Sequence, residues 1–194
     1  MVLAVKILDF GSNMLKYYKL HDDVKDPVFA TEGSACFDLH CYLSKLNQIT
    51  IYEMNNNKVL RFPQVYDGDI IQISIDPADR ALIPTGLIFD IPEGHSVRLH
   101  TRSSISLKKG LIMSNSEGII DSDYYHQTFV MLYNASADEV LIKNGERIAQ
   151  GELIKSYVYD IEETEDVPEQ KTDRVGGFGS TGKALSLIHI SEPT

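Results

Sequence analysis

The stretch of residues 115–124 carries the groups best suited to chemistry, because it places two carboxylates two residues apart. Ile119 and Ile120 have the β-branched side chains that favour a strand, and Asp121-Ser122-Asp123 follow them with the composition of a bend. Two carboxylates on one face of an extended segment repel unless a cation, a donor or a bend separates them. The pair therefore indicates a functional site at the end of a sheet, and a solvated acidic turn is the alternative.

Residues 174–182 form a second segment with binding potential, Arg-Val-Gly-Gly-Phe-Gly-Ser-Thr-Gly. Glycines permit close backbone approach, so successive amides can line an anion while Arg174 supplies charge. On composition alone, a flexible tail is the alternative. The spacing from Gly177 to Lys183 matches a phosphate-binding loop, but Ala184 stands where such a loop has a magnesium-binding Ser or Thr. We therefore reject the phosphate-binding-loop interpretation.

Short apolar or alternating runs, separated by turn signals such as Asp67-Gly68-Asp69, must position these segments. No stretch has a long helical period. Many short strands predict an all-β fold, a jelly roll or distorted β-barrel. The runs that we interpret as strands, besides Ile119-Ile120, are 15–20, 35–43, 48–52, 59–62, 70–75, 80–83, 86–91, 97–100, 111–113, 129–134, 140–142 and 152–159.

One domain is expected from 194 residues, 43% of them hydrophobic. After this domain, the acidic composition of residues 161–173 predicts an extended linker. The last ten residues resemble a translated sequencing-library adapter, and we exclude them from the fold. The expected parts are an uncertain N-terminal extension (1–14), the jelly-roll domain (15–160) with an inserted hairpin (44–69), the acidic linker (161–173), the glycine-rich C-terminal arm (174–182) and the adapter-like segment (185–194).

Charge and cysteine usage exclude several classes of protein. A net charge of −10 argues against a nucleic-acid partner, because duplex binding depends on clustered Lys and Arg. Cys36 and Cys41 are too few for a disulfide framework and are not spaced like zinc ligands, so we expect free thiols in a reducing compartment. Neither a signal peptide nor a membrane-spanning run is recognised. We expect a cytoplasmic protein, or one of the host-cell interior if it is virus-encoded.

Five segments together resemble the five ordered motifs of the homotrimeric deoxyuridine triphosphatase (dUTPase) family. The resemblance implies jelly-roll subunits that assemble as a trimer, with active sites shared between neighbouring chains. It also implies Mg²⁺-dependent hydrolysis of dUTP to dUMP and diphosphate. The segments are Ser34-Ala35-Cys36-Phe37-Asp38-Leu39, Arg102-Ser103-Ser104, residues 115–124, Gly145-Glu146-Arg147-Ile148-Ala149-Gln150, and residues 176–182 after Arg174.

The resemblance assigns Asp121 as the general base that activates a water for attack on the α-phosphorus, and an aspartate is ionised at neutral pH. Gln150 is expected to help hold that water, and Asp38 to contact the magnesium ion through water. The residues expected to bind phosphate oxygens are Arg102, Ser103 and Ser104.

The same family pattern assigns uracil and sugar recognition to the hairpin, through Asn115, Gly118 and Ile120, with Tyr124 packing under the deoxyribose. The arm is expected to close over the substrate as a lid. The arm residues that we expect to bind substrate are Arg174, Phe178, Gly179, Ser180 and Thr181.

Three departures from the family pattern bear on the site: Cys36 replaces a usual Gly, Arg174 is one residue closer to the Gly-Gly-Phe, and Tyr125-His126 replaces a usual basic-Gly pair. We interpret His100 and His126 as structural or surface groups. The alternative functions are a dCTP deaminase-type enzyme of the same fold, a nucleotide-binding regulatory protein and an inert structural jelly roll.

Overall fold

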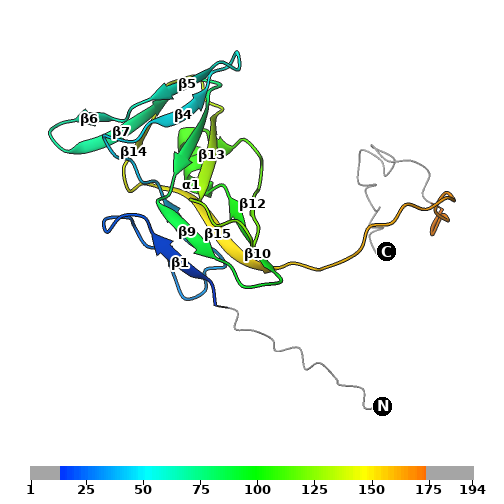
Figure 1. The fold of residues 1–194 in the computed structure, drawn as a ribbon. Coiled ribbons are helices and arrows are strands. Elements are labelled where there is room, and N and C mark those ends of the chain that lie inside the picture. Colours follow the sequence, from blue (N-terminus) through cyan, green and yellow to red (C-terminus); the bar gives the residue numbers. More distant parts are fainter. Residues whose placement is uncertain (1–13, 174–194) are drawn as a thin grey trace, which may run out of the picture. The chain divides into compact units, whose positions relative to one another are not determined.

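The computed structural model describes residues 14–173, which form antiparallel sheets and one short helix (Figure 1). The prediction of an all-β fold is confirmed. The strands are β1 (Lys16–Lys19), β2 (Val28–Phe29), β3 (Phe37–His40), β4 (Ile49–Tyr52), β5 (Lys58–Arg61), β6 (Gln64–Tyr66), β7 (Ile70–Ile75), β8 (Arg80–Pro84), β9 (Leu87–Asp90), β10 (His95–His100), β11 (Leu111–Met113), β12 (Gly118–Ile120), β13 (Phe129–Asn134), β14 (Val140–Lys143) and β15 (Arg147–Lys155), and the helix is α1 (Ser103–Lys109).

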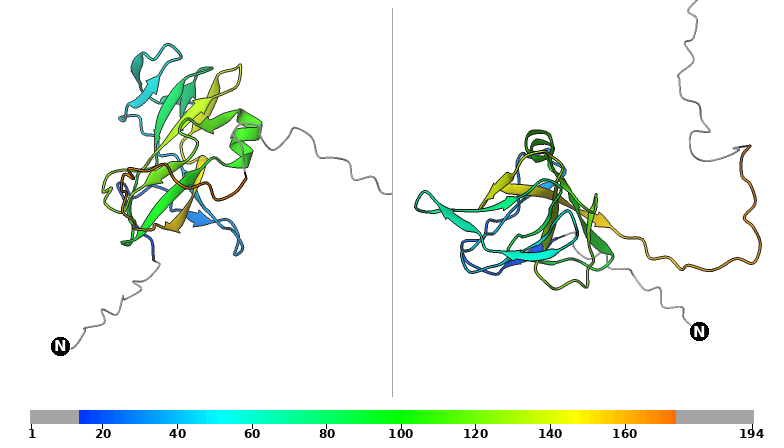
Figure 2. Two further views of the ribbon diagram at one scale, coloured as in Figure 1. Left: turned by 90° about the vertical axis from the view of Figure 1, so that its right-hand side faces the viewer. Right: turned by 90° about the horizontal axis from the view of Figure 1, so that it is seen from above.

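Two five-stranded sheets make up most of the fold, in the orders β12-β10-β15-β3-β2 and β11-β13-β8-β4-β5. Two smaller sheets, β1-β9 and β14-β7-β6, complete the set, and Figure 2 shows the sheets from two further directions. Most neighbouring strands are distant in sequence, as in β15 beside β3. Such crossovers between antiparallel strands are typical of the jelly roll.

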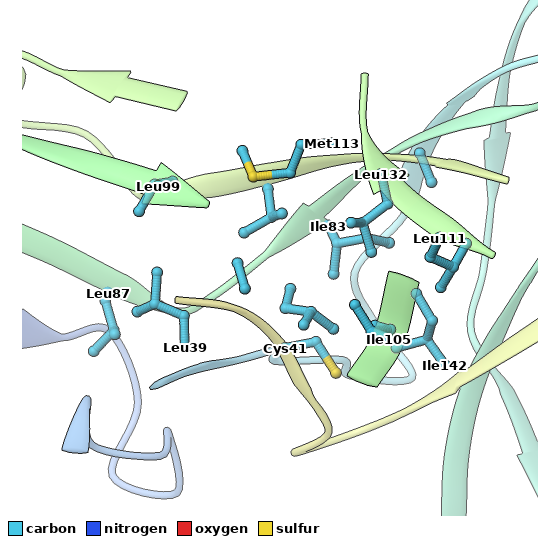
Figure 3. Close-up of a cluster of buried hydrophobic side chains, with 14 of the residues drawn as sticks. Leu39, Cys41, Ile83, Leu87, Leu99, Ile105, Leu111, Met113, Leu132 and Ile142 are labelled. Carbon is cyan, nitrogen blue, oxygen red and sulfur yellow. The ribbon is translucent and has the colours of Figure 1, made fainter. Parts of the chain in front are cut away.

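The core forms from one face of each large sheet. Leu39 of β3, Leu99 of β10 and Leu132 of β13 are buried, and their side chains point into the common cluster shown in Figure 3. Residues of these strands alternate between the core and the outside, because successive side chains of a strand point to opposite faces. Side chains on the other face of β10, β15 and β3 point away from this core, so that face can carry polar groups.

Helix α1 was not expected from the sequence. It has seven residues, of which Ile105 alone is buried, so it is too short to produce a recognisable helical period. It ends at Gly110, whose φ of 67° is in the left-handed region and whose N–H faces the carbonyls of Ile105 and Ser106. A Cβ at Gly110 would also lie 2.9 Å from the Cβ of Ser136. A glycine is therefore needed to end the helix there.

The expected insert at 44–69 contains three strands. Strands β4 and β5 pair as a hairpin, but β4 also pairs with β8, and Ile49 and Ile51 of β4 are buried. Strand β6 pairs with β7 in the three-stranded sheet. Part of this segment is therefore built into the core of the domain.

One strand boundary predicted from the sequence was wrong: the last strand is Arg147–Lys155 and not residues 152–159. Gly151, which broke the apolar pattern, is required by packing, because a Cβ there would lie 2.7 Å from the Phe37 ring. Strands β2 and β6 were also missed.

By its internal contacts the chain divides into two units, Met1–Val158 and Tyr159–Thr194. The described part of the second unit, residues 159–173, contains neither strand nor helix. Among residues 14–173, the helical content is too short and too polar to cross a bilayer.

Candidate active site

One face of the sheet β12-β10-β15-β3-β2 is polar, and it holds several of the predicted site residues. Asp38 lies opposite Gln150 in the β3–β15 register, and Gln150 lies opposite His100 in the β15–β10 register. Their neighbours Phe37 and Leu99 are buried on the core side. The strand alternation therefore gathers Asp38 and Gln150 side by side on the outer face, as the proposed catalytic group requires.

Asp38 is held by two arginines. Its Oδ1 accepts a hydrogen bond from Arg102 Nε at 2.7 Å, and its Oδ2 accepts one from Arg147 Nη1 at 3.0 Å. The Asp38 carboxylate is almost buried, so each bond is charge-assisted in a site with restricted access to water. A carboxylate offers about four acceptor positions, which leaves about two for water molecules.

Arg102 also connects this carboxylate to the start of α1. The residue occupies the N-cap with extended backbone, and its Nη1 donates to Ser104 Oγ at 3.1 Å. Ser103 and Ser104 are both exposed. One guanidinium and two hydroxyl groups thus lie together, a set that suits the tetrahedral oxygens of a phosphate.

The predicted hairpin is absent: β11 pairs with β13 and β12 with β10, so residues 114–117 form a turn between two sheets. Ser116 has a φ of 62°, its N–H donates to the Met113 carbonyl at 3.0 Å, and Asn115 is exposed beside it. Gly118 lies opposite Leu99, and a Cβ at Gly118 would come within 2.9 Å of the Leu99 Cβ. Gly118 is therefore required for β12 to pair closely with β10.

Asp121 begins a turn directly after Ile120, the buried end of β12. The N–H of Tyr124 donates to the Asp121 carbonyl at 3.1 Å, and the Tyr124 hydroxyl donates to the Gln127 carbonyl at 3.0 Å. The side chain of Asp121 is exposed, and Tyr124 is 39% exposed, so its ring is not a core residue. The expected bend exists and presents both side chains outward.

The structure does not bring Asp121 and Gln150 together within one chain. Ile120 lies opposite Val97, whereas Gln150 lies opposite His100 at the other end of β10. Asp121 and Gln150 are therefore separated by four residues along the strands, ~13 Å, and by two strand spacings, ~10 Å. Asp121 and Gln150 of one chain are then about 16 Å apart. The expected arm residues Arg174, Phe178, Gly179, Ser180 and Thr181 lie outside the described residues.

Arg147 contacts Asp38, which the sequence did not indicate. Strict alternation from Gln150 would place Ile148 on the polar face, but a register shift between Arg147 and Ala149 turns Ile148 into the core and Arg147 toward Asp38. The signal was available in the Arg-Ile-Ala-Gln order, because an apolar residue stands where alternation predicts a polar one.

A second polar cluster also went unrecognised. His100 Nε2 lies 2.9 Å from Glu152 Oε1, and Arg98 Nη1 lies 3.2 Å from Glu117 Oε2. With Cys36 Sγ, His100 and Glu152 form the group of metal-ligand type identified within the described part of the chain. These residues come from separate segments, so their spacing in the sequence gives no zinc-site pattern.

Burial acts on two further ionisable groups near this face. Burial lowers the pKa of His40, although the nearby Asp38 charge acts in the opposite direction. Burial also raises the pKa of the Cys41 thiol to about 12. Cys41 Sγ donates to the Lys143 carbonyl at 2.9 Å. Cys41 is thus a neutral core thiol, and Cys36 is the more accessible of the two free cysteines.

Comparison with known proteins identifies the family. The dUTPase family model matches residues 70–182. The chain is 34% identical over 165 residues to a deoxyuridine 5'-triphosphate nucleotidohydrolase of Hydrogenobaculum sp., which covers 84% of this chain and 94% of the relative. It is 35% identical over 170 residues to the enzyme of that name from Nautilia profundicola, covering 87% of this chain and 99% of the relative.

Solved structures show the same fold. A dUTPase from Streptococcus mutans matches with a TM-score of 0.56 and 25% identity, over 74% of this chain and 98% of that one. A dUTPase of Staphylococcus bacteriophage 80alpha, solved with dUpNHpp, matches with a TM-score of 0.67 and 20% identity over 89% of this chain and 100% of that one. The family model and the curated relatives together establish that this chain belongs to the dUTPase family.

Proposed function

We propose that this chain hydrolyses dUTP to dUMP and diphosphate by attack of an Asp121-activated water on the α-phosphorus. The curated relatives that are about one third identical to this chain in sequence are named deoxyuridine 5'-triphosphate nucleotidohydrolase. The observation that carries the mechanism is the joining of Asp38, Arg102 and Gln150 on one sheet face. That group has the cation and the oxygen donors that a triphosphate with its metal requires.

The triphosphate is bound, in this proposal, by Arg102 with Ser103 and Ser104. The Asp38 contact uses the Nε–H of Arg102 and the Ser104 contact uses one N–H of Nη1, so about three N–H groups are left for phosphate oxygens. Because Asp38 orients the cation before substrate arrives, less side-chain entropy is lost on binding.

Mg²⁺ fits the oxygen donors of Asp38 and Gln150. Carboxylate and amide oxygens are ligand types that magnesium accepts, and this ion keeps several of its water molecules in proteins. Both Asp38 oxygens already accept from arginines, so we assign Asp38 a contact through water. When bound, Mg²⁺ supplies neutralisation of charge on the triphosphate. A phage phi11 dUTPase in the same fold was described with a structural Mg(II) ion.

Asp121 acts as the general base and Gln150 orients the water. The Asp121 carboxylate is exposed on a turn whose backbone is fixed by the Tyr124 N–H, which donates to the Asp121 main-chain carbonyl. Transfer of the water proton to Asp121 accompanies formation of the bond to phosphorus and departure of diphosphate.

Uracil is selected by the β11–β12 turn and by β12, through the Asn115 side chain and the backbone near Gly118 and Ile120. Cytosine reverses the donor and acceptor pattern of that edge, so a pocket built for uracil leaves polar groups unpaired with cytosine. The outward-facing Tyr124 ring supports the deoxyribose. The arm residues Arg174, Phe178, Gly179, Ser180 and Thr181 complete the pocket as a lid.

The complete site is shared between chains of a homotrimer. Asp121 and Gln150 of one chain are about 16 Å apart by register, which is too far for both to contact one attacking water. A second copy that brings its Asp121 beside the Asp38–Gln150 group removes this conflict.

Both cysteines are free thiols, which supports a cytoplasmic location.

The proposal is tested by incubating the protein with dUTP and with dCTP in separate reactions with Mg²⁺ and analysing the products. dUMP and diphosphate are expected from dUTP, with little turnover of dCTP. Ammonia released from dCTP would instead identify a deaminase of the same fold, and binding of dUTP without any product would identify a regulatory protein.

A further inference from the structure

Three side chains that the proposed mechanism does not use meet on the polar sheet face. Cys36 immediately precedes β3, Glu152 lies in β15, and His100 ends β10. One ligand atom from each residue lies within 4.8 Å of the other two, and all three residues are partly buried. Neighbouring strands of one sheet therefore present a thiol, an imidazole and a carboxylate to the same point.

The geometry is close to that of a tetrahedral metal site. Zinc binds thiolate sulfur at about 2.3 Å and imidazole nitrogen or carboxylate oxygen at about 2.0–2.2 Å, which puts ligand atoms about 3.3–3.7 Å apart. The His100 Nε2 to Glu152 Oε1 distance is 2.9 Å, a hydrogen bond that a shared metal would replace and open by about 0.5 Å. The widest pair in the group needs a closing movement of about 1 Å.

The surroundings of His100 also fit a metal ligand. Its Nε2 faces Glu152, and its Nδ1 lies 3.9 Å from Glu117 Oε1. Metal-binding histidines commonly donate their second ring N–H to a carboxylate, which fixes the ring orientation. Glu117 is itself held by Arg98 at 3.2 Å. The ring thus lies between Glu152, which can share a metal, and Glu117, which must move from 3.9 Å to hydrogen-bond distance to orient it.

We infer that Cys36, His100 and Glu152 form a zinc-binding site with an open fourth position. A thiolate and an imidazole favour zinc over magnesium, which prefers oxygen ligands alone. The site differs from the proposed Asp38–Gln150 magnesium contact in every ligand, although it lies on the same sheet face. Zinc bound there would tie β3, β10 and β15 together, the three strands that carry or adjoin the triphosphate-binding residues.

Metal binding is tested directly on the full chain after treatment with a chelator and buffer exchange. Titration with Co²⁺, which accepts the same geometry as zinc, is followed by the near-ultraviolet charge-transfer absorption of a cobalt–thiolate bond. The chain has two cysteines, so the band reports on Cys36 or Cys41. We expect saturation at one metal per chain, loss of the band on adding Zn²⁺, and a zinc-dependent rise in melting temperature.

Matched variants decide which thiol is the ligand. Cys36→Ala is expected to abolish the band and to weaken zinc binding at least tenfold, whereas Cys41→Ala is expected to keep both, because Cys41 is buried against the Lys143 carbonyl. Glu117→Gln should weaken binding by about tenfold through the His100 contact. Absence of saturable Co²⁺ and Zn²⁺ uptake, or equal uptake by Cys36→Ala and the unaltered chain, would overturn the inference. Turnover of dUTP is not a readout, so this result is independent of the proposed function.

Discussion

Arg102 donates from Nε to Asp38 Oδ1 at 2.7 Å, and this bond joins the N-cap of α1 to strand β3. The same guanidinium reaches the Ser104 hydroxyl at the start of α1. A planar cation with donors on two sides can hold Asp38 and still face a ligand. This pair is the centre of the half-site that we assign to the triphosphate.

Arg102→Lys should lower kcat/KM for dUTP by about 10- to 100-fold. Lysine keeps the charge but cannot contact Asp38, Ser104 and a phosphate oxygen in one planar arrangement, and a bond between charged groups contributes about 1.5–3 kcal/mol. Steady-state kinetics measure the loss, and a thermal melt reports whether folding is intact.

Arg147→Lys is the matched control for Arg102→Lys, because Arg147 also donates to Asp38 but its side chain is half exposed. We expect a clearly smaller loss of kcat/KM for it. Equal losses in the two variants would show that Asp38 orientation alone, and not a direct Arg102 contact with substrate, explains the effect.

Gly118→Ala should destabilise the chain by about 1–3 kcal/mol, because its Cβ would lie 2.9 Å from the Leu99 Cβ in a closely paired part of the sheet. Shifting β12 would also displace the β11–β12 turn, so KM for dUTP should rise. Urea unfolding and kinetics measure the two effects. Gly33→Ala, where a Cβ meets no atom within 4 Å, should change neither quantity. A stable Gly118→Ala with unchanged KM would contradict the role assigned to this close contact.

The buried Cys41 thiol predicts a loss of stability at alkaline pH. Burial raises its pKa from 9.0 to about 12, so folding favours the protonated thiol. The stabilising contribution is complete below pH 9.0 and is lost as the pH rises from 9.0 toward about 12, at roughly 1.4 kcal/mol per pH unit.

The measurement for Cys41 is the free energy of unfolding of the unaltered chain minus that of Cys41→Ala, obtained by denaturant titration from pH 8 to about 10.5. This difference should shrink as the pH rises, since the tyrosines and lysines titrate alike in both proteins. A difference that stays constant over this range would show that Cys41 ionises as readily in the folded state as in the unfolded one.

Mixed trimers test the sharing of sites between chains. Arg102→Ala removes one half-site and Asp121→Asn the other, so each variant alone should be inactive. Co-expression in equal amounts should restore about a quarter of the unaltered activity, because half of the chains supply each intact half and the two halves combine at random. Absence of any recovery in verified mixed oligomers would mean that one chain forms the whole site, against the 16 Å separation that the register gives.

The sequence predicted the strands best where polar and apolar residues alternate, as in β7 and β10, or where an apolar run is continuous, as in β13. It failed at Gly151, where packing against Phe37 selects glycine inside a strand. It also missed α1, which is too short to show a period.

The motifs named site residues, whose roles stay predictions, but not their arrangement in space. Asp38, Arg102 and Gln150 were identified from motifs, and the structure places them together. The distance from Asp121 to Gln150 depends on the pairing of β12, β10 and β15, which are far apart in the chain, so local patterns could not supply it. His100 was interpreted as a structural or surface group for the same reason, since Cys36 and Glu152 reach it only through the sheet.

The most direct test of the whole account is the turnover of dUTP by the unaltered chain and by Asp121→Asn under identical conditions, with binding of a non-hydrolysable dUTP analogue measured beside it. We expect equal amounts of dUMP and diphosphate from the unaltered chain. Asp121→Asn should keep its affinity for the analogue within about threefold while turnover falls by about 10²–10⁴. Unchanged turnover in Asp121→Asn would contradict the assignment of Asp121 as the base on which the proposed mechanism rests.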